Sequence, residues 1–232
     1  MERKYCLLIG ISIFAVCDFW SGTGFNATGQ QPTPDLPWGN PLKADGSGTG
    51  GPNWVHYITN TYNDSLVLTY NYAAGGAYID PEGRTGEHQK LQQQILVDFT
   101  QTQWTADTSL FLIWAGVNDV IETSDEREFE EKFKELRKLL DHLHNIGARN
   151  FLLFNTAPLD RSPRGYAEAN KSWIHQIQPW NENITHVAKL DKDASMFLFD
   201  THKLFGNVMD DPSILEESAG FKNVTGFCPS CE

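Results

Sequence analysis

The stretch that decides the fold is Ser109-Leu-Phe-Leu-Ile-Trp-Ala-Gly-Val-Asn-Asp119. It begins as an unbroken apolar run of strand length, which is typical of a strand covered on both faces in a parallel sheet. The run ends at Gly116, and Asn118 and Asp119 follow at once. Ligands of open parallel sheets bind outside the carboxyl ends of the strands, so this polar pair lies where chemistry is expected. Gly, Asn and Asp are also the usual turn residues, and from this stretch alone a plain turn is an equal interpretation.

Apolar runs of strand length recur along the chain and alternate with segments of helical periodicity. The strand candidates are Ile9–Val16, Leu66–Tyr72, Ser109–Ala115, Asn150–Asn155 and Ser195–Phe199. The helix candidates are His88–Phe99, Asp125–Ile146 and a segment within Tyr166–Lys189. This alternation predicts an α/β fold, a three-layer α/β/α sandwich with a mostly parallel, five-stranded, flavodoxin-like sheet.

The helix candidate at Asp125–Ile146 has the clearest pattern. Its apolar residues recur at three- and four-residue steps and form one stripe that suits packing on a sheet: Phe129, Phe133, Leu136, Leu140 and Leu143. Thr123 with Glu126 predicts a capping box at its start, and Gly147 predicts its end.

Composition and charge limit the class of function. The chain has 232 residues, 40% of them hydrophobic and 12% aromatic, which fits one domain spanning residues 9–232. A formal net charge of -12 argues against nucleic acid and anionic membranes as partners. No apolar run is long enough to span a membrane comfortably, and no paired zinc-ligand cluster is present. We expect a monomer without cofactor or metal that acts on a small neutral molecule such as a sugar or an ester.

The first residues allow two interpretations that exclude each other. Residues 1–17 resemble a secretory signal, because Glu2-Arg3-Lys4 carries a net positive charge and Tyr5–Val16 is apolar. The same segment also suits the first strand of the sheet. Five acceptor sequons for N-glycosylation favour a secreted, extracellular glycoprotein: Asn26, Asn63, Asn170, Asn183 and Asn223.

Two further segments carry less information. Cys228-Pro-Ser-Cys231 has redox-motif spacing, but no thioredoxin-like context precedes it, so we interpret it as structural or accidental. The segment Gly22–Pro52 is rich in Gly, Pro, Asn and Thr and is too long for an ordinary connector. We expect it to be a substrate-facing loop over the sheet edge that holds Asn118, with partial disorder as the alternative.

Three segments that follow predicted strands carry a resemblance to a known family. They are Cys17-Asp18-Phe19-Trp20-Ser21-Gly22-Thr23-Gly24-Phe25-Asn26, Tyr70-Asn71-Tyr72-Ala73-Ala74-Gly75-Gly76-Ala77 and Gly116-Val117-Asn118-Asp119. This ordered set resembles the GDSL, or SGNH, hydrolase family, most closely its fungal secreted branch of carbohydrate acetylesterases. Gly51-Pro52-Asn53-Trp54-Val55 and Ala157-Pro158-Leu159-Asp160-Arg161 are similar to that branch too. The resemblance extends from about Ile9 to the end of the chain.

The resemblance implies an ester hydrolase with a serine nucleophile and a histidine base that is oriented by the aspartate of a late Asp-x-x-His motif. It also implies three donors for the oxyanion: the N–H of the nucleophile residue, a glycine N–H and an asparagine amide. Gly76 matches the oxyanion glycine and Asn118 the amide donor, while Asp119 braces the turn. Such donors stabilise the tetrahedral intermediate by about 3 kcal/mol each.

The nucleophile position departs from the family pattern. The family's Gly-Asp-Ser-Tyr falls on Cys17-Asp18-Phe19-Trp20, so Phe19 stands where the serine is expected, directly after Asp18. Ser21 lies two residues further on, and we do not expect it to substitute, because productive geometry tolerates little error.

The histidine motif departs as well. The family places it beyond Glu232, with a last helix whose absence would leave apolar surface exposed on the first or a neighbouring strand. Asp141-His142-Leu143-His144 lies within a helix candidate, and we expect surface histidines there. Asp200-Thr201-His202 has the wrong spacing and predicts a turn or a helix start. The remaining histidines have no partner evident in the sequence: His56, His88, His175 and His186.

These features predict a carboxylic ester hydrolase by family, acting on a small-molecule or carbohydrate ester, in a chain that lacks the nucleophile and the histidine motif. Two alternatives stay open: an inactive pseudoesterase that binds acetylated carbohydrate, and a truncated gene product. A flavodoxin-like nucleotide binder is disfavoured, because no glycine-rich phosphate loop follows the first strand.

Overall fold

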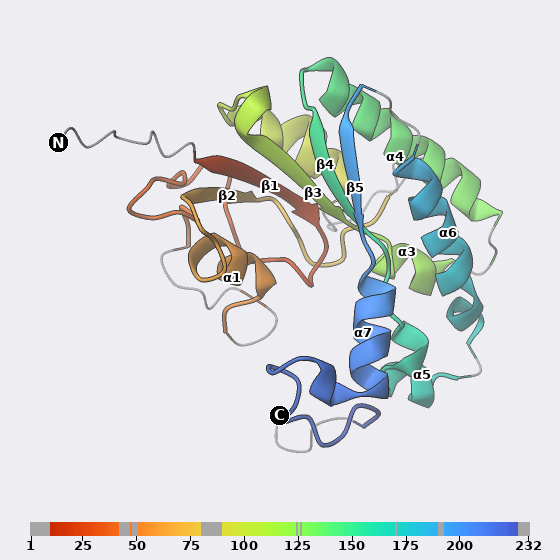
Figure 1. Ribbon diagram of the computed structural model, residues 1–232. Helices are drawn as coiled ribbons and strands as arrows, with labels where there is room; N and C mark the ends of the chain where they lie inside the picture. Colours follow the sequence, from red (N-terminus) through yellow and green to blue (C-terminus); the bar gives the residue numbers. More distant parts are fainter. Residues whose placement is uncertain are drawn as a thin grey trace.

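The computed structural model describes residues 10–41, 47, 51–79, 90–123, 125, 127–169, 171–189 and 193–226 (Figure 1). Its centre is a parallel sheet of five strands in the order β2-β1-β3-β4-β5. The strands are β1 Ile11–Cys17, β2 Val67–Asn71, β3 Ser109–Trp114, β4 Asn150–Phe154 and β5 Ser195–Phe199. This order is the flavodoxin-like one, so the predicted fold class is confirmed.

The strand predictions agree with the structure to within one or two residues over the described part of the chain. Of the segment 1–17, the structure places residues 11–17 in β1, while residues 1–9, including the predicted strand start at Ile9, lie outside the described residues. The β1 strand pairs with β2 on one side and β3 on the other, so its carboxyl end lies at the switch point of the sheet.

Helices cover both faces of the sheet (Figure 1). One face packs against α2 Leu91–Gln93 with its continuation to Gln101, against α4 Glu128–Asn145 and against α6 Ile177–Val187. The other face packs against α1 Trp54–Asn60. The remaining helices follow the carboxyl ends of strands or lie in connections: α3 Val117–Glu122, α5 Pro163–Ala167 and α7 Thr201–Asp210. Short helical turns occur at Ala106–Thr108, Leu159–Arg161, Ser172–Gln176 and Pro212–Ile214.

The main helix prediction is confirmed, but its predicted cap is wrong. The helix α4 begins at Glu128 after Arg127, which makes no side-chain capping hydrogen bond. Thr123 instead ends α3, where its N–H donates to the Asp119 carbonyl. Gly147 ends α4 as predicted, with a φ of 114° that favours glycine. The predicted helix at His88–Phe99 is described from residue 90, and the one within Tyr166–Lys189 is α6.

The prediction for the long loop, residues 22–52, is correct at its two ends, which lie together because the Asn53 amide donates to the Gly22 carbonyl at 2.9 Å. Residues near its start lie at the carboxyl edge of the sheet, because the Asn71 amide donates to Thr23 Oγ1 at 3.0 Å. Further on, the Thr69 N–H donates to the Pro37 carbonyl at 2.8 Å, so the chain there runs along the outer edge of β2. That part of the loop covers the edge strand β2 and does not lie over the carboxyl edge of the sheet.

Two of the large apolar side chains that are exposed lie on β5, the other edge strand: Phe197 and Phe199 are 56% and 42% exposed. On the first strand and its neighbours, where exposure is expected, Ile11 is the one large apolar residue exposed, at 41%, within the described residues. No helix within the described ranges is long and apolar enough to cross a membrane.

Candidate functional site

The three motifs meet at the carboxyl edge of the sheet, as predicted. The Asp18 N–H donates to the Trp114 carbonyl at 3.3 Å, and the Ala74 N–H donates to the Cys17 carbonyl at 3.2 Å. The Asn118 amide donates to the Ala77 carbonyl at 2.8 Å. Backbone and side-chain hydrogen bonds therefore join the segments that follow β1, β2 and β3 into one framework.

The third motif is a short helix and not a plain turn, because α3 begins at Val117. Gly116 precedes it with a φ of 128°, and a Cβ at this position would overlap the Trp180 indole. Glycine is required there both by the backbone conformation and by the close approach of Trp180. The sharp turn directs Asn118 toward the loop that contains Gly76.

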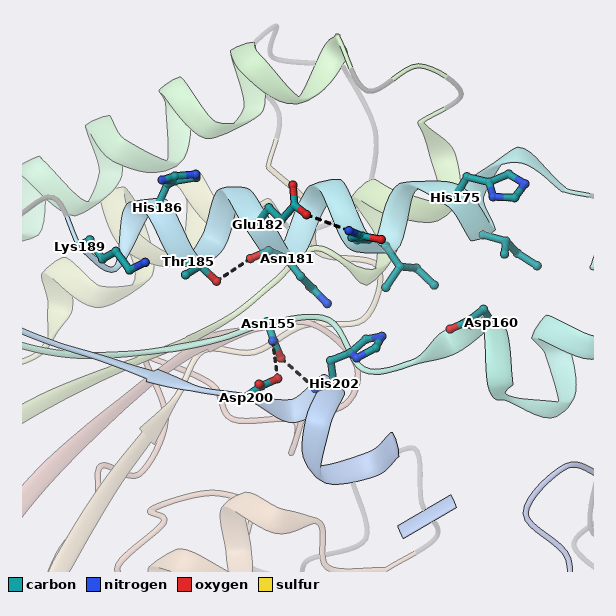
Figure 2. Close-up of a pocket in the computed structure, with 13 residues that line it drawn as sticks. Asn155, Asp160, His175, Asn181, Glu182, Thr185, His186, Lys189, Asp200 and His202 are labelled. Atoms are coloured by element: carbon teal, nitrogen blue, oxygen red, sulfur yellow. Dashed lines mark hydrogen bonds between the residues drawn. The ribbon is translucent and has the colours of Figure 1, made fainter. Parts of the chain in front are cut away.

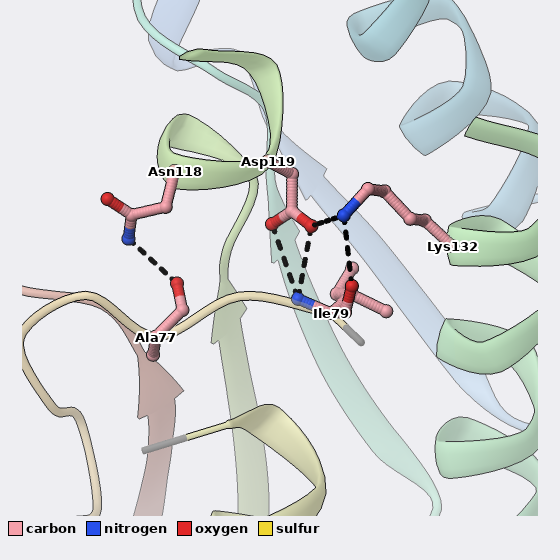
Figure 3. A network of polar contacts seen from close by, with 5 residues as sticks. All are labelled: Ala77, Ile79, Asn118, Asp119 and Lys132. Atoms are coloured by element: carbon pink, nitrogen blue, oxygen red, sulfur yellow. Dashed lines mark hydrogen bonds and ion pairs between the residues drawn. The ribbon is translucent and has the colours of Figure 1, made fainter. Parts of the chain in front are cut away.

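Asp119 binds the loop of the second motif (Figure 3). Its buried carboxylate accepts the Ile79 N–H at 3.1 and 3.3 Å and forms an ion pair with Lys132 Nζ at 2.8 Å. Lys132 also donates to the Ile79 carbonyl at 3.2 Å. Burial raises the pKa of Asp119, and the nearby Lys132 ammonium opposes that rise. Asp119 therefore braces the turn, as the sequence predicts.

Open donors lie at the positions that match the family's oxyanion hole. Gly76 has a φ of 72°, and its N–H donates to no acceptor in the part of the chain that the structure describes. The same holds, within those residues, for the N–H of Phe19. Asn118 is half-buried, and its amide nitrogen has a second hydrogen besides the one given to Ala77.

An aromatic side chain lies at position 19, where the resemblance to the family predicts the nucleophile. Phe19 is 46% exposed and lines a cavity of about 570 Å³ together with Trp20, Pro52, Asn53, Trp54, Trp114 and Phe205. Ser21 is fully buried, and its Oγ accepts the Trp54 indole N–H at 3.1 Å. The structure thus places Ser21 inside the fold, where its hydroxyl does not face the cavity that Phe19 lines.

The neighbours of Phe19 have strongly shifted acidities. Burial raises the pKa of the Asp18 carboxyl to about 7, the Trp20 N–H hydrogen bond of 3.0 Å opposes the rise, and the charge of Asp119 adds to it. Burial likewise raises the pKa of the Cys17 thiol to about 12. Cys17 is a buried free cysteine, and the other three cysteines lie outside the described residues.

Two of the histidines that the sequence left without partners, His175 and His186, line a polar cavity of about 700 Å³ together with His202, beyond the carboxyl ends of β4 and β5 (Figure 2). His56 lies in α1, where its Nδ1 accepts the Asn53 N–H at 3.3 Å, and His88 lies outside the described residues. The titratable residues that line the polar cavity are Asp160, His175, Glu182, His186, Lys189, Asp200 and His202. Sequence reasoning missed this grouping, because the residues come from separate helices and turns. Within the described residues no group of three or more His, Cys, Asp or Glu side chains could hold a metal ion.

The two Asp-His pairs in the sequence, Asp200 with His202 and Asp141 with His144, lie at the ends of helices. Asp200 caps α7, where its Oδ1 accepts the Lys203 N–H at 3.0 Å and the Asn155 amide at 2.8 Å, so the predicted helix start is confirmed. Asp141 and His144 lie near the end of α4 and line a small hollow beside the first residues of β4 and β5. Neither pair lines the cavity that contains Phe19.

The glycosylation candidates differ in their surroundings. Asn26 and Asn223 are exposed. The amide nitrogens of Asn63 and Asn183 donate to backbone carbonyls, of Ile58 at 3.2 Å and Pro179 at 3.0 Å respectively. Asn170 lies outside the described residues.

Comparison with known proteins adds a family context. The chain matches the model of the GDSL-like lipase/acylhydrolase family over residues 12–230. An acetylesterase of Thermothelomyces thermophilus is 29% identical over 235 residues, which cover 92% of this chain and 76% of that protein. The structure of an acetylxylan esterase of Geobacillus stearothermophilus is similar with a TM-score of 0.57 and 14% identity, over 97% of this chain and 91% of that one. A variant of that esterase gives a TM-score of 0.57 over 95% and 88% of the two chains, at 13% identity.

Proposed function

The chain belongs to the GDSL-like lipase/acylhydrolase family of carboxylic ester hydrolases, and on that premise we propose that it is an acetylesterase-type protein that binds an ester without serine chemistry. The observation that carries this proposal is Phe19 at the nucleophile position, with Ser21 buried and hydrogen-bonded to Trp54. A phenyl ring cannot attack a carbonyl. A serine needs both reach and a base that accepts its proton.

The lining of the cavity around Phe19 supports the same proposal. No histidine in the part of the chain that the structure describes lines that cavity. Of the histidines in the polar cavity, His202 follows Asp200, whose carboxylate is engaged as a helix cap. An aspartate used in this way is not placed to orient an imidazole as the family's Asp-x-x-His motif requires.

Ligand binding survives in this proposal, because its donors are separate from the nucleophile side chain. The open N–H groups of Phe19 and Gly76 and the amide of Asn118 need only the backbone and one asparagine. Such donors can bind the carbonyl oxygen of an ester when the triad is absent. A pseudoesterase is therefore the function that these residues favour.

An acetylated carbohydrate is the ligand class that we propose, with its sugar in the polar cavity beyond β4 and β5. The net charge of -12 suits a neutral ligand, and the polar cavity offers side chains that can donate to and accept from sugar hydroxyls, among them Asp160, His175 and Glu182. The acetylesterase and acetylxylan esterase names of the related proteins point the same way. We propose that the protein acts as a monomer.

Secretion and glycosylation belong to the same proposal. Of the four sequon asparagines that the structure describes, Asn26 and Asn223 are the exposed ones. Expression in a eukaryotic secretory host should yield protein that loses mass on treatment with peptide N-glycosidase, with glycan mapped to these asparagines. Unmodified protein in the medium would contradict glycosylation, and retention in the cells would contradict secretion.

The experiment that tests the proposed function is hydrolysis of p-nitrophenyl acetate. We expect the release of nitrophenol to equal that of a heat-denatured sample. Turnover at ordinary enzyme rates that is abolished by Ser21→Ala would overturn the proposal and establish an active hydrolase.

Binding is measured separately by calorimetry with an acetylated xylo-oligosaccharide. We expect Asn118→Ala to weaken binding by about tenfold, while Asn145→Ala, at the exposed end of α4, leaves it unchanged. Equal affinities in the wild type and both variants would show that Asn118 does not contact the ligand.

A further inference from the structure

The cavity in front of β1 and β3 has an unusual lining. Five of the seven residues that surround its volume of about 570 Å³ are aromatic, and they come from four different elements. Phe19 and Trp20 follow β1, Trp54 begins α1, Trp114 ends β3 and Phe205 lies on α7. Cavities of this size accommodate small organic ligands.

The rings are arranged edge to face around the cavity. Ring centroids of Trp20 and Trp114 lie 5.2 Å apart at 84°, and those of Phe19 and Trp20 lie 6.0 Å apart at 80°. Trp54 and Trp114 are 5.8 Å apart at 64°, and Trp20 and Phe205 are 6.3 Å apart at 45°. These separations are the ones that aromatic pairs prefer, and a further flat ring can extend the same packing.

Two walls of the cavity are fixed by hydrogen bonds. The Trp114 indole donates to the Asn155 carbonyl at 3.2 Å, and the Trp54 indole donates to Ser21 Oγ at 3.1 Å. Trp114 is also 8% exposed, so its ring has little freedom to turn. The cavity is therefore formed before a ligand arrives, which lowers the entropy lost on binding.

The polar groups of the lining are already engaged, with one exception. Asn53 is buried, its Oδ1 accepts the Val55 N–H at 3.1 Å, and its Nδ2 donates to the Gly22 carbonyl at 2.9 Å. Pro52 has no N–H to offer. The Trp20 indole N–H makes no hydrogen bond within the residues that the structure describes. Among the side chains of the lining, the Trp20 indole is thus the one donor without a partner in the described part of the chain.

The ratio of many aromatic rings to one open side-chain donor favours one kind of ligand. A sugar ring that entered the cavity would lose water from several hydroxyl groups and would regain one hydrogen bond from a side chain. A flat aromatic ring would lose little hydration free energy on entering the cavity. It would cover Phe19 and Phe205, which are 46% and 39% exposed to water. Its one polar substituent could accept from the Trp20 indole.

We propose that this cavity is a binding site for a flat aromatic ring with one or two polar substituents, such as a phenol or an aryl ester. The proposal goes beyond the ester-binding function and does not rest on it, because it assigns a different ligand class to a cavity whose side chains include neither Gly76 nor Asn118. Replacement of the family's serine by Phe19 extends the aromatic lining.

The test is calorimetric titration of the full chain with 2-naphthol, with methyl β-D-xylopyranoside as the sugar of comparison. We expect one naphthol per chain and weaker or no xyloside binding. Phe205→Ala and Phe19→Ala should each weaken naphthol binding by about tenfold, since each removes one packed ring. Trp20→Phe keeps a ring and loses the donor, so we expect a loss of about threefold.

Phe221→Ala is the matched control, because Phe221 is 58% exposed and does not line the cavity. Each variant is compared after its circular dichroism spectrum matches that of the wild type. Tighter binding of the xyloside than of naphthol, or naphthol affinities that are equal in wild type, Phe19→Ala and Phe205→Ala, would overturn the proposal. No turnover enters this readout, so its failure is distinguishable from failure of the proposed function.

Discussion

The segments after β1 and β3 follow neighbouring strands of one sheet, yet they are built in opposite ways. After β3, the buried carboxylate of Asp119 is tied to Lys132 and to the Ile79 backbone. After β1, the half-exposed ring of Phe19 extends into an aromatic cavity. The segment after β3 carries the Gly-x-Asn-Asp pattern that resembles the family, and the segment after β1 carries Phe19 where we propose that the nucleophile is absent.

The difference teaches which parts of an active site are also parts of the fold. The third motif is part of a buried polar network. Its loss would leave the charged group of Asp119 or of Lys132 buried without its partner, or exposed to water. The side chain at position 19 lies partly in water, and its replacement costs the fold little. A site of this kind can lose its chemistry and keep its framework.

The sharpest test of this contrast is Lys132→Met. It leaves the Asp119 carboxylate buried without its cation, and we expect the free energy of unfolding to fall by about 3–5 kcal/mol. Chemical denaturation measures the loss. Lys138→Met is the control on the same helix. The Lys138 side chain is 63% exposed in its ion pair with Glu135, so we expect its replacement to lower the free energy of unfolding by less than about 0.5 kcal/mol. Equal losses in the two variants would break the comparison.

Asp18 gives a pH-dependent test on the β1 side. Its pKa is about 7 in the folded chain against an ordinary value of 3.8, so between these values the folded state binds the proton more tightly than the unfolded state. The free energy of unfolding should therefore fall as pH rises from about 4 to about 7, by up to about 4 kcal/mol. Below pH 4 the Asp18 carboxyl is protonated in both states, so the free-energy cost of ionising it in the folded chain is absent.

The matched variant is Asp18→Asn, which keeps an acceptor for the Trp20 N–H and has no proton to lose. We expect its stability to exceed that of the wild type at pH 8 and the gap to close by pH 4. Asp35→Asn changes an exposed carboxylate and should leave the wild-type profile unaltered. A wild-type profile retained by Asp18→Asn would assign the pH dependence to another group.

Gly116→Ala separates conformation from packing on the β3 side. The new Cβ would adopt an unfavourable φ and overlap the Trp180 indole, for an expected loss of about 2–3 kcal/mol. Gly147→Ala has a similar φ of 114°, but its Cβ would be 3.8 Å from the Trp104 ring, so we expect about 1 kcal/mol. Equal thermal shifts in the two variants would show that contact with Trp180 does not fix the turn.

Phe19→Ala should have a smaller effect on stability than Lys132→Met or Gly116→Ala, at most about 1 kcal/mol, because the ring is only half covered. Thermal denaturation followed by circular dichroism measures it. A loss as large as that of Lys132→Met would mean that Phe19 is required by the fold, and the two segments would then no longer differ in the way described.

The sheet was predictable from the sequence because its strands are short apolar runs that end at Gly, Asn or Asp. The carboxyl-edge position of Asn118 follows from the same pattern. The helix α3 was not predicted, since Gly-Val-Asn-Asp has the composition of a turn, and Thr123 therefore looked like the cap of α4. The pairing of the Pro37 carbonyl with β2 uses only backbone groups, which carry no side-chain signal.

The two cavities were beyond sequence reasoning for a different reason. Their lining residues are far apart along the chain. The contacts of α7 with Asn155, after β4, and with Trp20, after β1, bring His202 to one cavity and Phe205 to the other. The aromatic residues near Phe19 had no periodicity that a single element would impose. Their grouping depends on tertiary structure alone.

The central claim is that no serine of this chain acts as an activated nucleophile at the site. Incubation with a p-nitrophenyl phosphonate ester, which labels activated serines irreversibly, tests it most directly when followed by intact-mass spectrometry and peptide mapping. The account predicts that the chain stays unlabelled under conditions that label an active serine esterase completely. A stoichiometric phosphonate adduct on Ser21, or on any other serine beside Gly76 and Asn118, would contradict it.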